Sequence, residues 1–160
     1  MHARDRIMQG VEKLANAVES TLGASGKCVI YEDAMGKPVI TKDGVTVAES
    51  VVLLNPVENI GATLIKEAAK KTVREAGDGT TTATVLAHSL LQEMNSANDY
   101  TVRQIKDSVN AGLKKVLEYL DTKSIKIKDE MLEDVASISC NNDVKLGSII
   151  ADAYKSVGAN

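Results

Sequence analysis

This chain has to build its core without phenylalanine or tryptophan, because neither occurs among its 160 residues. Its only aromatic residues are four tyrosines, so burial depends on Ala, Val, Ile, Leu and Met. Side chains of this size fill an interior when helices pack closely against one another. The composition therefore predicts a mainly α-helical protein. The length allows one ordinary domain or a domain with an appendage.

Apolar residues recur at spacings of three and four along several segments, which is typical of amphipathic helices. The pattern predicts helices over residues 7–22, 56–76, 85–93 and 102–120, then a short helix at 131–137 and a last helix after Asp143. Runs containing Val and Ile at 27–32 and 38–41 flank a turn and predict a small β-hairpin. Residues 45–52 fit either a short helix or a strand. A change of composition predicts a domain boundary near residue 124.

The segment from Gly77 to Thr84 carries the strongest functional signal. Gly77 is predicted to end one helix in the left-handed conformation. The threonine amides then fall in the first turn of the next helix, where unpaired N–H groups attract anions. Asp78 would repel a bare phosphate, which suggests that Mg²⁺ bridges its carboxylate to phosphate oxygens. Ordinary capping and turn chemistry is the alternative interpretation, although a run of three threonines, which are poor helix formers, favours a ligand.

Two other segments could converge on this loop. Residues 21–26 form a turn of small residues, where backbone can approach a ligand closely. Lys42 and Asp43, followed by Gly44, supply a cation and a second carboxylate. Taken singly, each segment is also explained as a helix end with glycine or as a hairpin turn. Together the three segments contain the groups of a phosphate site, but the glycine spacing before Lys27 is too short for a P-loop.

Charge and cysteine content argue against other classes of protein. The formal charge of −3 comes from 19 basic and 22 acidic residues without a long run of one sign, which argues against nucleic-acid and membrane-surface binding. No apolar stretch approaches the roughly 20 residues that span a bilayer, and the N-terminus lacks a signal-peptide core, so we expect a cytoplasmic protein.

Cys28 and Cys140 fit no metal-ligand spacing and are expected to be core thiols. We expect a surface or core role for His88.

Three motifs, at residues 21–23, 40–45 and 77–87, strongly resemble the nucleotide-binding segments of group I, GroEL-type chaperonins. The resemblance continues through residues 59–62 and 138–141 and covers nearly the whole chain. It implies a multihelical fold with a small β-hairpin. Residues 1–123 would form the N-terminal half of the ATP-binding equatorial domain, and residues 124–160 would begin the intermediate, or hinge, domain.

The resemblance also implies roles for individual residues. Asp78 would hold Mg²⁺, Lys42 would meet a phosphate, and Asp43 would lie near the attacking water as a supporting catalytic carboxylate. The remaining contacts with ATP or ADP would come from two segments: Thr21, Leu22, Gly23 and Ala24 along the nucleotide, and Gly79, Thr80, Thr81 and Thr82 at the β and γ phosphates.

A parent protein of this kind would hydrolyse ATP with Mg²⁺, and with K⁺ as a further cation, to fold unfolded client proteins as an isomerase. It would bind a co-chaperonin and form a homo-oligomeric double ring. Here Ala24 and Ser25 replace the proline and lysine of the family's turn. The hinge carboxylate that orients the hydrolytic water has no counterpart in these residues, so this chain alone is expected to be inactive. Two other functions remain: a helical interaction or oligomerisation module without a nucleotide, and a nucleotide hydrolase completed by dimerisation.

Overall fold

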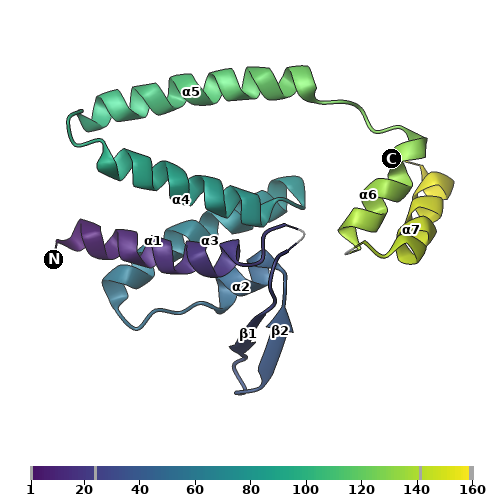
Figure 1. Ribbon diagram of the computed structural model, residues 1–160, viewed down its shortest axis with the longest axis horizontal. Coiled ribbons are helices and arrows are strands. Elements are labelled where there is room, and N and C mark those ends of the chain that lie inside the picture. Colours follow the sequence, from purple (N-terminus) through teal and green to yellow (C-terminus); the bar gives the residue numbers. More distant parts are fainter. Residues whose placement is uncertain (1, 24, 141, 159–160) are drawn as a thin grey trace. The chain divides into compact units, whose positions relative to one another are not determined.

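The structure of the protein, a computed structural model, describes residues 2–23, 25–140 and 142–158. The chain divides into two compact units, residues 1–105 and 106–160. Both are built from helices, with a small β-hairpin in the first, as the sequence predicts (Figure 1). Within the described ranges, no helix combines the length and the hydropathy needed to span a bilayer.

The described part of the first unit contains helices, a hairpin and the first residues of α5. Its complete elements are α1 (Ala3–Glu19), β1 (Val29–Glu32), β2 (Pro38–Thr41), α2 (Gly44–Ser50), α3 (Pro56–Ala76) and α4 (Thr80–Ser96). The predicted hairpin is confirmed as antiparallel, with Ile30 opposite Ile40. In the ambiguous segment at 45–52, residues 45–50 belong to the helix α2, and Val51 and Val52 follow it. The threonines belong to α4, which begins before the apolar pattern at residue 85.

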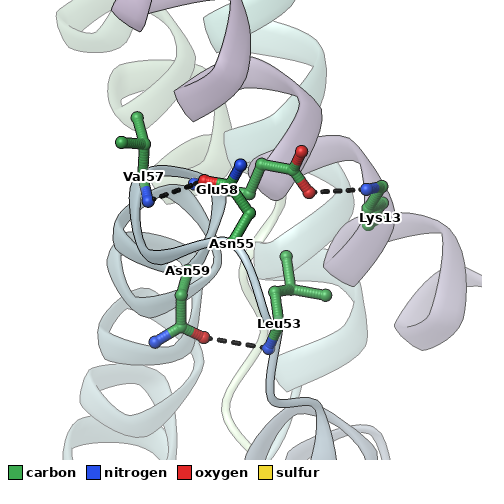
Figure 2. A network of polar contacts seen from close by, with 6 residues as sticks. All are labelled: Lys13, Leu53, Asn55, Val57, Glu58 and Asn59. Carbon is green, nitrogen blue, oxygen red and sulfur yellow. Dashed lines mark hydrogen bonds and ion pairs between the residues drawn. The ribbon is translucent and has the colours of Figure 1, made fainter.

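Helix α3 has the bounds that the sequence predicts. The Asn55 side chain accepts hydrogen bonds from the N–H groups of Val57 and Glu58, at 3.0 and 3.3 Å, and Pro56 occupies the first turn (Figure 2). Gly77 ends the helix with φ of 74°, and its N–H donates to the Val73 carbonyl at 2.9 Å. Both helix ends are therefore set by local sequence.

The core of the first unit is aliphatic, as the composition requires. Helix α1 contacts α2, α3 and α4 and supplies the largest share of buried side chains. The cluster consists of Val11, Leu14, Val18, Val47, Ala48, Ala62 and Ile65. Because α1 lies against three other helices, its position decides where their ends meet.

Helices α1 and α3 touch at the level of their backbones. A Cβ on Gly10 would lie 1.8 Å from the carbonyl oxygen of Glu58, and a Cβ on Gly61 would lie 2.0 Å from that of Ile7. Beside this crossing, the Lys13 ammonium donates to the Glu58 carboxylate at 2.5 Å (Figure 2). Only glycine at these two positions permits so close an approach.

The second unit contains most of α5 (Val102–Lys123), a 3₁₀ turn η1 (Asp129–Met131), α6 (Leu132–Ser139) and α7 (Val144–Val157). No residue of α5 is buried. Helices α6 and α7 pack closely, since a Cβ on Gly147 would lie 2.2 Å from the Ser137 Oγ. Asp143 caps α7 as predicted, accepting from the Leu146 N–H at 3.1 Å. The domain boundary predicted at 123/124 falls at the end of α5 and stays a prediction.

The expectation of buried cysteines is wrong for Cys28, which is exposed, and Cys140 is half-buried. Cys28 lies directly before β1, the first strand of the hairpin. Ile30 and Ile40, on the two strands, are also exposed. Cysteine is commonly buried because its side chain is apolar, but this hairpin leaves much of its apolar surface uncovered.

Replacing Gly10 by alanine should destabilise the first unit, because the new methyl group would overlap the Glu58 carbonyl. We expect a loss of about 3 kcal/mol, at the upper end for overpacking, in the free energy of unfolding measured with urea. Gly112→Ala is the control. Its Cβ would meet nothing within 4 Å, so the higher helix propensity of alanine should stabilise α5 by up to about 1 kcal/mol. Equal stability of the two variants would contradict the close crossing.

Candidate functional site

Three loops of the first unit meet around a cavity of about 280 Å³. One loop follows α1, one joins β2 to α2, and one joins α3 to α4. The cavity is lined by Thr21, Leu22, Gly23, Lys42, Asp43, Gly44, Asp78, Gly79, Thr80, Thr81 and Thr82. The structure thus brings together every predicted site residue except Ala24, which lies outside the described residues. It adds Gly44, which was predicted only as part of a turn.

The start of α4 presents backbone donors to this cavity. Gly79 precedes the helix with φ of 82°, and no side chain caps it, whereas Asp43 and Asp143 cap α2 and α7. The first hydrogen bond of the helix runs from the Ala83 N–H to the Gly79 carbonyl at 2.9 Å. The N–H groups of Thr80–Thr82 precede that bond, so they carry the partial positive charge of a helix N-terminus. They can donate to an anion.

Asp78 does not cap α4, so the capping interpretation of this residue is wrong. Its Oδ1 accepts from the neighbouring Gly79 N–H at 2.6 Å, and the side chain is exposed. Its other carboxylate oxygen has no protein partner among the described residues. Those residues contain no group of three or more His, Cys, Asp or Glu side chains that could hold a metal. A single free carboxylate suits Mg²⁺, which takes its remaining ligands from phosphate and water.

Asp43 is held by the helix that it caps. Its Oδ2 accepts from the Thr46 N–H at 2.8 Å and from the Thr46 hydroxyl at 2.5 Å. Burial alone would raise the pKa of Asp43, but hydrogen bonds from Thr46 and from the Val45 N–H outweigh it and leave the pKa below its ordinary value of 3.8. Asp43 is therefore an anion at neutral pH. Thr46 was not among the predicted site residues, although its spacing of three from an N-cap aspartate is typical of such pairs.

Helices α2 and α4 approach each other closely beside the cavity. A Cβ on Gly44 would lie 2.2 Å from the Thr81 Oγ1 and 3.3 Å from the Val18 Cγ1. Gly44 is buried at this contact. The first residue of α2 therefore fixes the separation between the Asp43 carboxylate and the start of α4.

Packing explains part of the threonine run. Thr80 and Thr84 are 9% and 0% exposed and share one face of α4 with the buried His88, which takes the core role that was one of its two expected roles. Thr81 is half-buried, and Thr82 is exposed. The side chains of Thr80 and Thr84 are therefore largely buried, while Thr80, Thr81 and Thr82 line the cavity.

The remaining lining residues differ in how free they are to bind. The Thr21 hydroxyl donates to the Val18 carbonyl at 2.7 Å and is buried, so it is committed to the end of α1. Gly23 has φ of 78°, which lets the loop turn beside the cavity. The Lys42 side chain is exposed and has no ion-pair partner among the described residues. Its ammonium group is available for an anion.

Thr46→Val should raise the pKa of Asp43, because the variant loses the hydroxyl donor but keeps the burial. An NMR titration of the Asp43 carboxyl carbon measures this. A lowered folded pKa means that the carboxylate stabilises the fold above its unfolded pKa of about 3.9, and that this contribution is lost as pH falls through the folded pKa. As pH falls below about 4, the free energy of unfolding should therefore decrease less in the variant than in the native chain. The control is Thr63→Val, which removes a hydroxyl bonded to the Asn59 carbonyl far along the chain from Asp43. An unchanged Asp43 pKa in Thr46→Val would contradict the role of the Thr46 hydroxyl.

Comparison with solved structures finds relatives over most of the chain. Two crystal structures of the chaperonin gp146 from the bacteriophage EL 2 (Pseudomonas aeruginosa), solved in the presence of ATP-BeFx, are similar to it. In crystal form II the identity is 31% and the TM-score 0.83, with 95% of this chain and 27% of that chain covered. In crystal form I the values are 30% and 0.85, with 98% and 28% covered.

A group III chaperonin in the open state is similar at 29% identity, with a TM-score of 0.78 and coverage of 94% of this chain and 31% of that chain. The chain therefore spans between about a quarter and a third of the length of these relatives. Residues 14–160 also match the sequence pattern of the TCP-1/cpn60 chaperonin family. With its helical fold and its cavity of three converging loops, the chain belongs to the TCP-1/cpn60 chaperonin family.

Proposed function

We propose that the cavity binds the phosphates of ATP or ADP together with Mg²⁺. One observation carries this proposal: the uncapped start of α4, the free ammonium of Lys42 and the exposed carboxylate of Asp78 line the same cavity. Helix N-termini bind phosphate through backbone N–H groups. A phosphate site with a carboxylate beside it is electrostatically balanced when a divalent cation lies between them.

Each lining residue then has a defined task. The N–H groups of Thr80–Thr82 donate to phosphate oxygens, and Lys42 adds a positive charge. Asp78 holds Mg²⁺, which when bound would neutralise phosphate charge. Asp43 is a supporting carboxylate that α2 keeps ionised and oriented. The loop of residues 21–24 lies along the rest of the nucleotide, where Leu22, 44% exposed, offers apolar surface.

We further propose that the chain is part of a group I chaperonin subunit, with residues 1–123 in its equatorial domain and residues 124–160 in its intermediate domain. The three motifs support this subfamily, and two similar chaperonins were solved with ATP-BeFx. The parent protein would hydrolyse ATP in the cytoplasm, with K⁺ as a further cation, and fold client proteins within a homo-oligomeric double ring that binds a co-chaperonin. These 160 residues alone would not catalyse hydrolysis.

Asp78→Ala should weaken the binding of ADP in the presence of Mg²⁺. We expect at least about a tenfold rise in Kd, as for loss of a charged contact, and little change when EDTA removes the metal. Isothermal titration calorimetry measures both. The matched control is Glu75→Ala, which removes an exposed carboxylate at the end of α3 whose partner is Lys71, at 3.8 Å.

The control separates a specific metal contact from a general change of surface charge. Equal weakening by the two substitutions would reject Asp78 as the Mg²⁺ ligand. The absence of any ADP binding by the native chain at millimolar nucleotide would instead favour a helical interaction module without a nucleotide. A defined dimer that retains nucleotide stoichiometrically would favour the hydrolase completed by dimerisation.

A further inference from the structure

We propose that Lys66, which does not line the cavity, is a positioning residue for it. Lys66 holds the C-terminal end of α2, and α2 carries Asp43 and Gly44 at its other end. This inference rests on the proposed nucleotide site, because positioning has meaning only for a site that binds.

The C-terminal end of α2 is held by a side chain from another helix. The Lys66 Nζ on α3 donates to the carbonyl of Val51, the residue after the helix, and approaches the Glu49 carbonyl at 3.4 Å. Val51 itself is extended, with ψ of 117°. A cation at this end also interacts favourably with the helix dipole. Lys66 thus supplies the C-terminal cap.

Helix α2 depends on such contacts because it has only seven residues. A helix this short is not stable by itself in water. Val47 and Ala48, in the middle of the helix, pack into the core, and Asp43 caps its N-terminus. The Lys66 contact is a third point of attachment, at the end furthest from the cavity.

Lys66 makes this contact although its surroundings disfavour a charge. Burial lowers the pKa of its ammonium most, the neighbouring Lys70 lowers it further, and Glu49 partly opposes them, so that the net pKa lies below the ordinary value of 10.5. The carbonyl oxygens of Val51 and Glu49 accept from this half-buried ammonium. Lys70, four residues further along α3, contacts α2 differently: its Nζ lies 3.8 Å from the Glu49 carboxylate.

A displacement at one end of α2 reaches the cavity because the helix is short, about 10 Å long at 1.5 Å per residue. At its first residue, Gly44 leaves no space between α2 and the Thr81 side chain. If the C-terminal end is released, the helix can tilt about its buried middle, and this contact changes. The Lys42 ammonium and the Asp43 carboxylate, directly before the helix, then move relative to the Thr80–Thr82 N–H groups.

Three variants test this role: Lys66→Met, which keeps the aliphatic stem and removes the ammonium, Lys66→Arg, which keeps a cation, and Lys70→Met as the matched control. We expect Lys66→Met to raise the Kd for Mg-ADP about tenfold, as for loss of a charged hydrogen bond. Amide hydrogen exchange should become faster in α2 while α3 and α4 keep their protection. Lys66→Arg should restore most of both properties, and Lys70→Met should leave both near native.

Other outcomes overturn the inference. If Lys66→Met binds Mg-ADP no more weakly than Lys70→Met, Lys66 does not position the site. If exchange rises equally in all helices of the first unit, Lys66 has only a general structural role. A native chain that does not bind Mg-ADP overturns the proposed function. In that case, faster exchange confined to α2 in Lys66→Met would show that Lys66 holds this helix, and unchanged exchange in α2 would show that it does not.

Discussion

The backbone contact between α1 and α3 is the interaction on which the first unit depends. At Gly10 and Gly61 there is no side chain between the two helices, and each glycine meets a carbonyl of the other helix. This closeness compensates for a core made of Ala, Val, Leu and Ile, because small side chains fill an interior only when helices approach closely. With α1 and α3 held together, α1 also contacts α2 and α4.

The cavity is a consequence of this packing. The end of α1, the start of α2 and the start of α4 meet because α2 and α4 both lie against α1. The chemical groups divide by type: backbone N–H groups and Lys42 suit an anion, and Asp78 suits a cation. Asp43 is kept ionised by hydrogen bonds from the first turn of α2. Such a division fits the proposed binding of a metal–phosphate pair rather than of either ion alone.

Much of this could be predicted from sequence because the signals are local. Asn55-Pro56 and Gly77 fix both ends of α3, and Asp143 fixes the start of α7. The sequence allowed the three loops to converge because together they contain the groups of a phosphate site. The cavity confirms their convergence, although the ligand itself stays a prediction.

What could not be predicted depends on contacts between distant segments. Helix α2 is too short for periodicity to distinguish it from a strand, and its end is capped by Lys66 from another helix. The threonine run was expected to reflect a ligand or capping and turn chemistry, whereas Thr80 and Thr84 also pack into the core beside His88. Cys28 is exposed because its burial depends on what covers the hairpin, not on the chemistry of the thiol.

We propose that the start of α4 receives the phosphates of a magnesium-bound nucleotide. A crystal structure of the chain with Mg-ADP tests it most directly. We expect phosphate oxygens within hydrogen-bond distance of the Thr80, Thr81 and Thr82 amide nitrogens, and a metal ion joining the Asp78 carboxylate to a phosphate oxygen. Nucleotide bound elsewhere on the chain, with solvent alone at the first turn of α4, would contradict the account.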